Sequence, residues 1–490
     1  MKRSTWRKHH KWLGIVFCFF MLMFCLSGIV LNHRTVVSDI NVGREWLPER
    51  YRYTAWNGGL LRGTTVYTDK DCATCVVVYG TGGIWQTDSA ASFFKDFNKG
   101  LPDGADYRQI RNVVQTEEKD LFAVSIFGLY RYAGKDEGWR RVYLPNDENE
   151  LLTDVACRND TLLVVGRSYL YLSTAPYTSF KRIQLKEPNN YRKEVSLFRT
   201  VWMLHSGELF GITGRIAVDA IAVVLIVLCV TGMIYWLLPK YICRKRSKGE
   251  NTQAALRITR ISYLWHNGIG RVTIALTMLI AITGWCLRPP GMIPLALTKT
   301  SAIPGTVLDS PNPWNDKLRM IRYDETCKDW LLATSDGFYS LKNLGDIPVR
   351  INHTPPVSVM GLNVFQRDKS GKWLCGSFSG MFVWDREQRC VVDYFSHEPA
   401  IDTAAPPFGK QAISGYSQDL TDKEFTVEYY EGTNVISQPA ALERLPMSLW
   451  NVALEVHSGR IYLGIAATYI FVFLAGIGAI WCLWSGWKMR

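Results

Sequence analysis

Histidine is scarce in this chain, with eight among 490 residues, and several signatures of well-known enzyme classes are missing. No CxxCH sequence occurs, which excludes covalent attachment of a c-type haem. The short basic segments contain no GxGxxG sequence, which argues against a nicotinamide cofactor bound by this chain. Neither an HExxH motif nor a Ser/His/Asp arrangement is present, which argues against a protease. The function of the chain must therefore be inferred from features other than these motifs.

Charge is nearly absent from four stretches that are rich in apolar residues. Each approaches the roughly 20 residues that a helix needs to cross a hydrocarbon core of about 30 Å. The third is the shortest, and it reaches about 20 residues only if Gly268–Arg271 continue the same helix. The four stretches are Trp12–Leu31, Ile216–Leu238 (where only Asp219 is charged), Val272–Leu287 and Ile461–Trp484. They predict a membrane protein with four transmembrane helices.

Basic residues gather before the first span, between the second and third spans, and at the C-terminus. If every span crosses, these three places lie on one side, and the positive-inside rule makes that side cytoplasmic. The connecting segments, about 34–200 and 291–455, are then extracytoplasmic. The first span is too long for a secretory signal and has no small-x-small cleavage site, so we expect it to be retained. The basic residues are Lys2, Arg3, Arg7, Lys8 and Lys11; Lys240, Arg244, Lys245, Arg246, Lys248, Arg257 and Arg260; and Lys488 and Arg490.

Four of the histidines lie at span edges, in matching places in the two halves of the chain. His10 and His266 open the first and third spans, whereas His205 and His457 each precede a span within a His-Ser-Gly sequence. The spacing is 195 residues in the first half and 191 in the second. Ligating side chains at membrane depth are costly and by default functional. Two histidines near each face is the arrangement that two bis-histidine haems require.

The two halves share further features, which predict a two-fold internal repeat. Each span carries a Ser/Thr-Gly pair near its far end: Ser27-Gly28, Thr231-Gly232, Thr283-Gly284 and Ser485-Gly486. Small residues there allow close approach either of another helix or of a flat macrocycle. Parallel repeats are related by an axis normal to the membrane. That operation would bring His10 toward His266 on the inner side and His205 toward His457 on the outer side.

The two connecting segments have the pattern of β-structure. Five stretches combine an apolar run, small or polar residues, and an aromatic-rich second run, and a sixth, weaker match begins near Phe425. Starts separated by 41 to 45 residues are typical of propeller blades. About three blades per segment are too few for a ring, so one ring shared by both segments is expected. The five stretches are Val76–Asp88, Leu121–Gly134, Leu162–Ala175, Trp330–Asn343 and Trp373–Arg386.

Six cysteines fall in these segments, where disulfides are permitted: Cys72, Cys75, Cys157, Cys327, Cys375 and Cys390. The CxxC spacing of Cys72 and Cys75 fits a local disulfide, two unpaired strand cysteines or, less well, a redox-active pair.

The fold class predicted is therefore a multi-pass α-helical membrane protein with a β-rich, propeller-like extracytoplasmic domain built from two segments. The expected boundaries are 1–33 for the N-terminus and first span, 34–200 for the first β segment, 201–240 for the second span, 241–265 for a cytoplasmic loop, 266–290 for the third span, 291–455 for the second β segment and 456–490 for the last span.

The span edges resemble those of PepSY-associated transmembrane proteins. The similarity is carried, in order, by His10-Lys11-Trp12-Leu13-Gly14, by Leu204-His205-Ser206-Gly207 with Gly211, by His266 with Gly268 and Gly270, by Thr283–Pro290, and by His457-Ser458-Gly459-Arg460 with Gly464. It covers about a third of the chain. Blade-like repeats stand where a PepSY module would be expected, which puts the substrate in doubt more than the haem.

Members of this family with iron-uptake roles act as inner-membrane reductases of ferric siderophores and hold haem with transmembrane histidines. The resemblance implies two b-type haems here, bound by His10, His266, His205 and His457, with neutral imidazoles as axial ligands. His33 could replace His205 or His457, and His9 competes with His10. Arg460 or the lysines Lys8 and Lys11 could pair with haem propionates, although simple interfacial snorkelling explains the lysines better.

The expected function is electron transfer across a bacterial inner membrane to an extracytoplasmic ferric chelate or siderophore. Quinol or a separate protein would be the electron donor, membrane lipid surrounds the helices, and no nucleic-acid partner is expected. Periplasmic or TonB-dependent uptake proteins are candidate partners. The alternatives are a non-catalytic, membrane-anchored sensor or binding protein, and a component that assists a transporter or peptidase.

Overall fold

The computed structural model describes residues 2–69, 72–146, 150–358, 360–400, 409–421 and 423–489. The chain divides into two units. A helical unit comprises Met1–Val37, Arg192–Ser310 and Leu449–Arg490, and a β unit comprises Ser38–Tyr191 and Pro311–Ser448. Both units are therefore assembled from segments that are far apart in the sequence.

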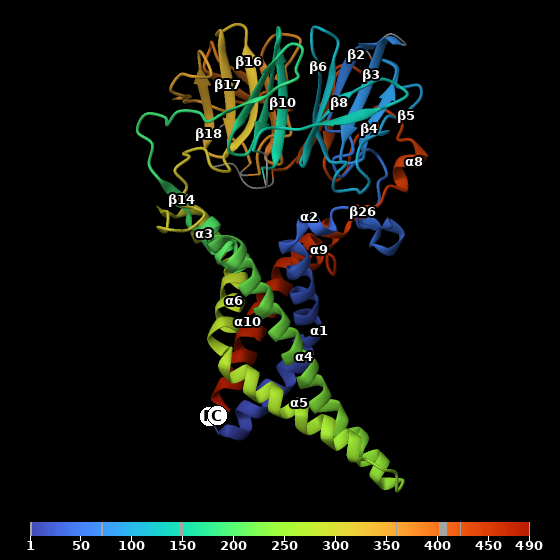
Figure 1. Ribbon diagram of the computed structural model, residues 1–490, viewed down its shortest axis with the longest axis vertical. Coiled ribbons are helices and arrows are strands. Elements are labelled where there is room, and N and C mark those ends of the chain that lie inside the picture. The colour runs from blue at the N-terminus through green and yellow to red at the C-terminus, as the bar shows by residue number, and fades with distance from the viewer. Residues whose placement is uncertain are drawn as a thin grey trace. The chain divides into compact units, whose positions relative to one another are not determined.

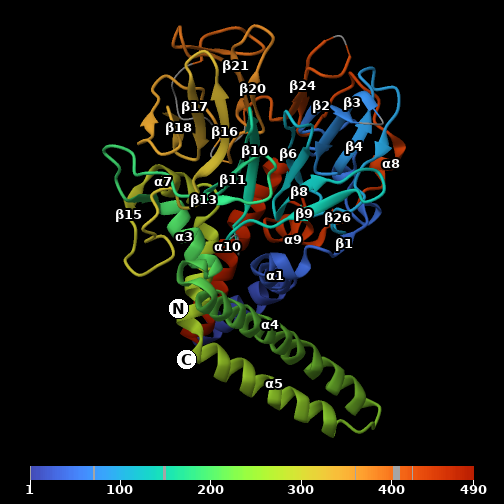
Figure 2. The ribbon, with the colours of Figure 1, turned by 45° about the horizontal axis from the view of Figure 1, so that its top comes forward.

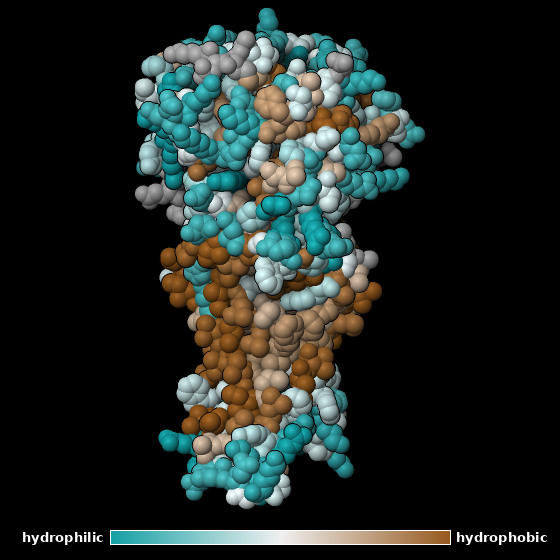
Figure 3. Space-filling view, turned by 90° about the vertical axis from the view of Figure 1, so that its right-hand side faces the viewer, coloured by the Kyte–Doolittle hydropathy of each residue, from teal (hydrophilic) through white to brown (hydrophobic). Residues whose placement is uncertain are grey.

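Long apolar helices dominate the helical unit (Figure 1). Within the described residues, three spans are long and apolar enough to cross a membrane: Arg3–Asn32, Glu208–Ser247 and Ala467–Lys488. They correspond to α1 (Arg3–Asn32), α4 (Gly211–Ser247) and α10 (Ile465–Lys488). A bent pair, α5 (Gln253–Val272) and α6 (Ile274–Cys286), makes a fourth if it is counted as one span. Apolar side chains form a belt around these helices (Figure 3).

The third span differs from the expectation that Gly268–Arg271 simply lengthen it. The chain bends by 71° between α5 and α6, so these residues belong to α5 and not to the helix that follows. At the break, the hydroxyl of Thr273 donates to the carbonyl of Ile269 (2.9 Å) and that of Thr277 donates to the carbonyl of Thr273 (3.2 Å). Such back-bonding bends helices. The 13 residues of α6 span only about 20 Å.

Two short helices precede long ones and end in the His-Ser-Gly sequences. They are α3 (Leu197–Ser206) and α9 (Leu449–His457). Gly207 follows α3 with φ of 82°, and Gly459 lies just beyond α9 with φ of 77°. Glycine is the residue that adopts this left-handed conformation at low cost, and it commonly ends helices. Each motif therefore places its histidine in the last turn of a short helix. The remaining elements of this unit are α2 (Arg34–Val37), α7 (Met292–Leu297), β14 (Glu194–Ser196) and β15 (Lys299–Ser301).

The β unit consists mainly of antiparallel sheets of four strands, arranged in chain order (Figure 2). The first three sheets are β2 (Gly63–Asp69), β3 (Cys72–Gly80), β4 (Gly83–Thr87) and β5 (Lys95–Asp96); β6 (Ile110–Gln115), β7 (Leu121–Ser125), β8 (Gly128–Tyr132) and β9 (Trp139–Val142); and β10 (Leu152–Arg158), β11 (Thr161–Gly166), β12 (Leu170–Thr174) and β13 (Lys181–Ile183). The second segment supplies β16 (Leu318–Asp324), β17 (Asp329–Thr334), β18 (Gly337–Leu341) and β19 (Val349–Arg350); β20 (Val364–Arg367), β21 (Trp373–Ser377), β22 (Gly380–Asp385) and β23 (Cys390–Asp393); and a two-stranded sheet, β24 (Ile413–Ser417) and β25 (Phe425–Glu428). Outside these sheets lie β1 (Asn41–Val42), which pairs with β26 (Met447–Ser448), and the short α8 (Ala440–Glu443).

All five stretches that the sequence marks as strand pairs are antiparallel pairs, namely β3 with β4, β7 with β8, β11 with β12, β17 with β18 and β21 with β22. The first strands of successive sheets contact one another: β2 with β6, β6 with β10, β10 with β16, β16 with β20, β20 with β24, and β24 with β2. Sheets from the two segments are thus neighbours within one unit.

The second strand of each four-stranded sheet is buried on both faces along most of its length, which explains its apolar character. In β11, Leu163 and Val165 pack into a core shared with the β16 sheet, whereas Leu162 and Val164 pack into a core shared with the β7 sheet. Successive side chains of a strand point to opposite faces. A strand that lies between two cores must therefore be apolar at every position, as in parallel sheets covered on both sides.

A buried ion pair joins the two β segments. Asp154 of β10 is fully buried, and its carboxylate accepts hydrogen bonds from Arg322 of β16 (Nη1–Oδ2, 2.5 Å) and from the amide of Ile321 (3.2 Å). Asn112 of β6 donates to the same carboxylate (2.9 Å). A buried carboxylate is tolerated only when such donors satisfy it.

We predict that Asp154→Ala lowers the free energy of unfolding of the β unit by about 3 kcal/mol or more, because it leaves the Arg322 charge buried without its partner. Thermal melting followed by circular dichroism of the full-length protein would measure this. Asp136→Asn, at an exposed position of the same unit, is the control and should melt like the wild type. Equal melting of the two variants would contradict the prediction.

Candidate functional site

His10 and His266 lie side by side in the helical unit. His10 belongs to α1 and His266 to α5, and their ring centroids are 5.9 Å apart. The Nδ1 atom of His10 lies 2.9 Å from the carbonyl oxygen of Cys482 in α10, and that of His266 lies 2.9 Å from the carbonyl of Leu228 in α4. A carbonyl can only accept, so Nδ1 carries the proton in both rings. Nε2 is left as the unprotonated nitrogen.

His205 and His457 form a second pair with the same geometry. Their ring centroids are 6.1 Å apart. The Nδ1 atom of His205 lies 3.2 Å from the carbonyl of Ile280 in α6, and that of His457 lies 2.9 Å from the carbonyl of Phe24 in α1. In this pair, too, the hydrogen bond fixes the tautomer and leaves Nε2 free to act as a ligand.

The four Ser/Thr-Gly pairs contact the four histidines. A Cβ atom added to Gly28 would lie 3.3 Å from Cε1 of His457, and one added to Gly232 would lie 3.1 Å from Cε1 of His266. The corresponding distances are 2.7 Å from Gly284 to His205 and 3.0 Å from Gly486 to His10. In each case the carbonyl that accepts from Nδ1 belongs to the residue four positions before the glycine. The glycines therefore make room for imidazole edges.

Three of these contacts include a hydroxyl group. The Oγ atoms of Ser27, Thr231 and Thr283 each lie 3.2 Å from the Nδ1 atom of the histidine beside them. The sequence offers these glycines as positions for helix or macrocycle packing, and it does not reveal the carbonyl partners. The recurring Ser/Thr-Gly pair was the signal that could have pointed to them.

The spacing within each pair suits two ligands on one metal ion. Imidazoles that bind from opposite sides, at metal–nitrogen distances of about 2 Å, have ring centroids about 6 Å apart. The two pairs themselves are well separated, because α1 carries His10 at one end and contacts His457 through Gly28 at the other. At about 1.5 Å per residue, these two positions on α1 are about 27 Å apart. That length is close to the thickness of a hydrocarbon core.

The other histidines are engaged elsewhere or exposed. Nε2 of His33 lies 2.8 Å from Oδ2 of Asp219 in α4, so its ring interacts with a carboxylate and not with either pair. His9 packs beside Trp481, whose indole N–H donates to its Nδ1 (3.2 Å). His353 and His397 are exposed in the β unit.

The basic residues considered as propionate partners have different environments. Arg460 forms a two-point ion pair with Glu455, with Nε–Oε2 at 2.9 Å and Nη2–Oε1 at 2.5 Å. Lys8 and Lys11 are exposed, and the Lys11 ammonium lies 5.5 Å from the centroid of the Trp12 ring.

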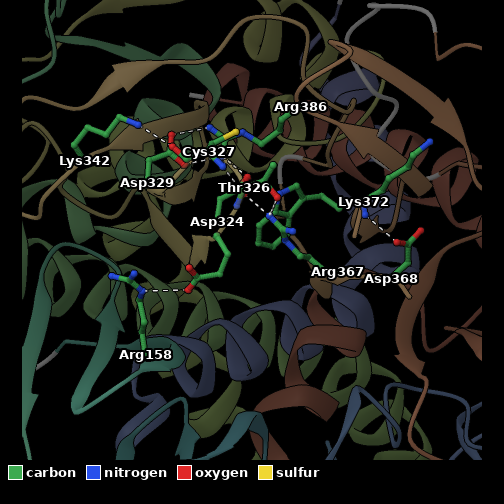
Figure 4. A network of polar contacts seen from close by, with 12 residues as sticks. Arg158, Asp324, Thr326, Cys327, Asp329, Lys342, Arg367, Asp368, Lys372 and Arg386 are labelled. Carbon is green, nitrogen blue, oxygen red and sulfur yellow. Dashed lines mark hydrogen bonds and ion pairs between the residues drawn. The ribbon is translucent and has the colours of Figure 1, made fainter. Parts of the chain in front are cut away.

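One group of potential metal ligands lies in the β unit (Figure 4). Ligand atoms of Asp324, Cys327 and Asp329 lie within 4.8 Å of one another. Arg386 already donates to both carboxylates, to Asp324 at 2.5 Å and to Asp329 at 2.7 and 2.8 Å, and Arg367 also donates to Asp324. Arginine thus occupies the positions that a cation would need, and the group is a structural link between neighbouring sheets.

Hydrogen bonding keeps Asp324 ionised. Burial alone would raise its pKa, but hydrogen bonds from the Trp373 indole, the Cys327 amide and the Arg386 guanidinium lower the pKa to about 2. The neutralising charges are therefore part of the folded structure at any physiological pH.

The cysteines of the β unit differ in oxidation state. Cys75 is disulfide-bonded, whereas Cys157, Cys327, Cys375 and Cys390 are free. The side chain of Cys72 lies outside the part of the chain that the structure describes.

Comparisons with known proteins give one informative result. No curated protein matches the chain. A solved structure, the extracellular domain of a protein assigned as a one-component system in B. thetaiotaomicron, aligns at 10% identity with a TM-score of 0.34. The alignment covers 78% of this chain and 39% of that one, so the chain spans about two fifths of that structure's length. A likeness this weak supports no conclusion.

The informative match is to the family model of the PepSY-associated TM region, which covers residues 1–239. This range includes α1, α3 and most of α4, and with them His10, His205 and two of the four histidine-contacting glycines. Residues 1–239 of this chain are therefore a PepSY-associated TM region.

Proposed function

We propose that this protein binds two b-type haems and passes electrons across a membrane to an acceptor on the far side. The observation that carries the proposal is the double occurrence of paired histidines, with ring centroids 5.9 and 6.1 Å apart and Nδ1 held by a helix carbonyl in all four rings. A histidine that binds a metal through one ring nitrogen typically donates a hydrogen bond from the other nitrogen in this way.

The paired histidines and the apolar side chains around them are suited to binding haem. Each pair offers two neutral imidazoles whose unprotonated Nε2 atoms are available, and the bundle is lined by apolar side chains, as cofactor sites between helices usually are. Nε of Arg215, near the start of α4, is buried without a hydrogen-bond partner, as a donor awaiting an anionic group would be. When bound by two imidazoles, haem supplies one-electron redox chemistry with no open position for oxygen.

The chain itself holds the four imidazole rings in position and shields them in part from water. The carbonyls four residues before the glycines fix the tautomer and orientation of each ring, and the glycines allow the rings to approach the helix backbone. The four histidines are partly buried among the helices, which limits the access of water to the imidazoles. Because about 27 Å of α1 separates the two sites, they would lie near opposite faces of a membrane.

For topology we keep the arrangement that the basic residues predict, with both termini cytoplasmic in a bacterial inner membrane. The His10–His266 pair would then be the inner site and the His205–His457 pair the outer site. The β unit would lie outside as a propeller-like ring, which is supported by the succession of contacts from β2 through β24 and back to β2. The recurrence of one histidine–glycine contact in both halves supports the internal repeat.

A ferric chelate or siderophore is the acceptor that we favour, because reduction to ferrous iron weakens binding by hard oxygen ligands and releases the metal. A quinol is the favoured donor. A groove of about 600 Å³ between α6 and α10, lined by apolar residues that include Met278, Trp481, Trp484 and Trp487, could accept such a molecule from the lipid. An uptake receptor or periplasmic protein could deliver the acceptor.

The detergent-purified protein is expected to show a low-spin b-type spectrum with about two haems per chain. Pyridine haemochrome quantitation after expression with adequate haem supply would measure the content. A colourless protein would instead favour the alternative of a membrane-anchored sensor or binding protein.

We further predict that His10→Ala and His266→Ala abolish the same haem, and that His205→Ala and His457→Ala abolish the other, because each pair would share one iron. Redox titration of the four variants would identify the haem that is missing from each. His33→Ala is the matched control and should retain both haems. If His33→Ala removed a haem that His205→Ala left in place, the pairing would be wrong.

The glycines give an independent test. Gly284→Ala would place a methyl group 2.7 Å from His205 Cε1, so the ring must move and the haem of that pair should be lost or strongly depleted. Gly268→Ala in α5 is the control, since no atom lies within 4 Å of its added methyl group. Alanine generally favours helix formation over glycine by about 1 kcal/mol, so a loss of haem could not be ascribed to helix propensity. Equal haem content in both variants would count against the proposed role of Gly284.

A further inference from the structure

Arg288 lies next to the His205–His457 pair. It follows α6, four residues after Gly284, the glycine that contacts His205. The amides of Leu287 and Arg288 bond to the carbonyls of Gly284 and Trp285, three residues earlier (3.3 Å each), so the chain makes one more tight turn after α6 ends at Cys286. Arg288 therefore lies about one turn beyond Gly284, and it is close enough to His457 to interact with it electrostatically.

The charges around Arg288 are unbalanced. Its guanidinium lies within electrostatic range of His457, Arg460, Tyr469 and Glu455. The one carboxylate among these groups, that of Glu455, is occupied at both oxygens by Arg460. Among the described residues no hydrogen bond or ion pair holds the Arg288 side chain, which is partly buried. An unpaired cation beside a site at membrane depth is costly and marks a functional position.

We propose that Arg288 binds a carboxylate at this pair, and that the carboxylate is a propionate of the haem that His205 and His457 would ligate. The inference rests on the proposed function and adds a residue to it. Arginine suits the task because its planar fork of N–H donors matches a carboxylate at two points. Arg460, the basic residue near His457 that the sequence suggests, is already paired with Glu455. The Arg288 side chain has no such partner within the described part of the chain.

If Arg288 neutralises a propionate, it should change the affinity and the reduction potential of only the haem that His205 and His457 would hold. A cation that neutralises a propionate favours the reduced iron, whose site carries one positive charge less. Without the cation, the haem should bind more weakly and be reduced at a more negative potential. The haem of the His10–His266 pair, about 27 Å away along α1, should be unaffected.

The test uses Arg288→Gln and Arg288→Lys in the full chain, both in the wild type and in a His10→Ala background that would leave only the haem of the second pair. Haem content and midpoint potential are measured by pyridine haemochrome and redox titration. For Arg288→Gln we expect loss of half or more of that haem, or a shift of its potential to more negative values, with occupancy restored in Arg288→Lys. Arg244→Gln, at an exposed position of α4, is the control.

Unchanged haem content and potential in Arg288→Gln would overturn the propionate assignment. If that variant instead kept its haem but bound ferric citrate more weakly, with binding of ferric acetohydroxamate unchanged, the carboxylate would belong to the acceptor, which still supports Arg288 as a carboxylate-binding residue. A wild-type protein with two haems and an unaffected Arg288→Gln variant would defeat this inference alone. A wild-type protein without haem would defeat the proposed function as well.

Discussion

One hydrogen bond, repeated four times, organises the helical unit. In each case the Nδ1–H of a histidine donates to a helix carbonyl, and the residue four positions after that carbonyl is a glycine. A side chain at the glycine would press against the imidazole ring. Three of the bonds join helices that are not consecutive in the sequence, namely α1 to α10, α3 to α6 and α9 to α1, and the fourth joins the neighbours α4 and α5. Because the carbonyl is already part of a helix, its position is fixed, and so the imidazole is oriented without a flexible partner.

The short helices and the bend serve these four contacts. The left-handed glycines after α3 and α9 end those helices just past His205 and His457, so that the following chain can turn into a long helix. The break at Thr273 lets α5 run along α4, where His266 meets Leu228, while α6 takes another direction to meet His205. The two parts of the bent pair therefore make different contacts.

The β unit obeys a different constraint, that of sheets buried on both faces. Strands such as β11 place alternate side chains into separate cores, and the few polar groups inside are paired, as Asp154 is with Arg322. Those pairs connect the segments that the spans separate in the sequence. The segment before α3 is thereby bound to the segment after α7, and neither has a complete set of partners alone.

The sequence by itself determined the apolar spans, the strand pairs, the four edge histidines and the Ser/Thr-Gly pairs, because these follow from local composition and period. It also indicated which histidines should meet, through the spacing of the two halves. Only the tertiary structure decided that the glycines contact imidazoles, that His33 contacts Asp219 and His9 contacts Trp481, and that the third span bends. It also decided that Arg460 is paired, whereas Arg288 has no partner among the residues that the structure describes. These outcomes depend on which helices lie side by side, and hydrogen bonds and ion pairs between residues hundreds of positions apart leave no periodic trace in the chain.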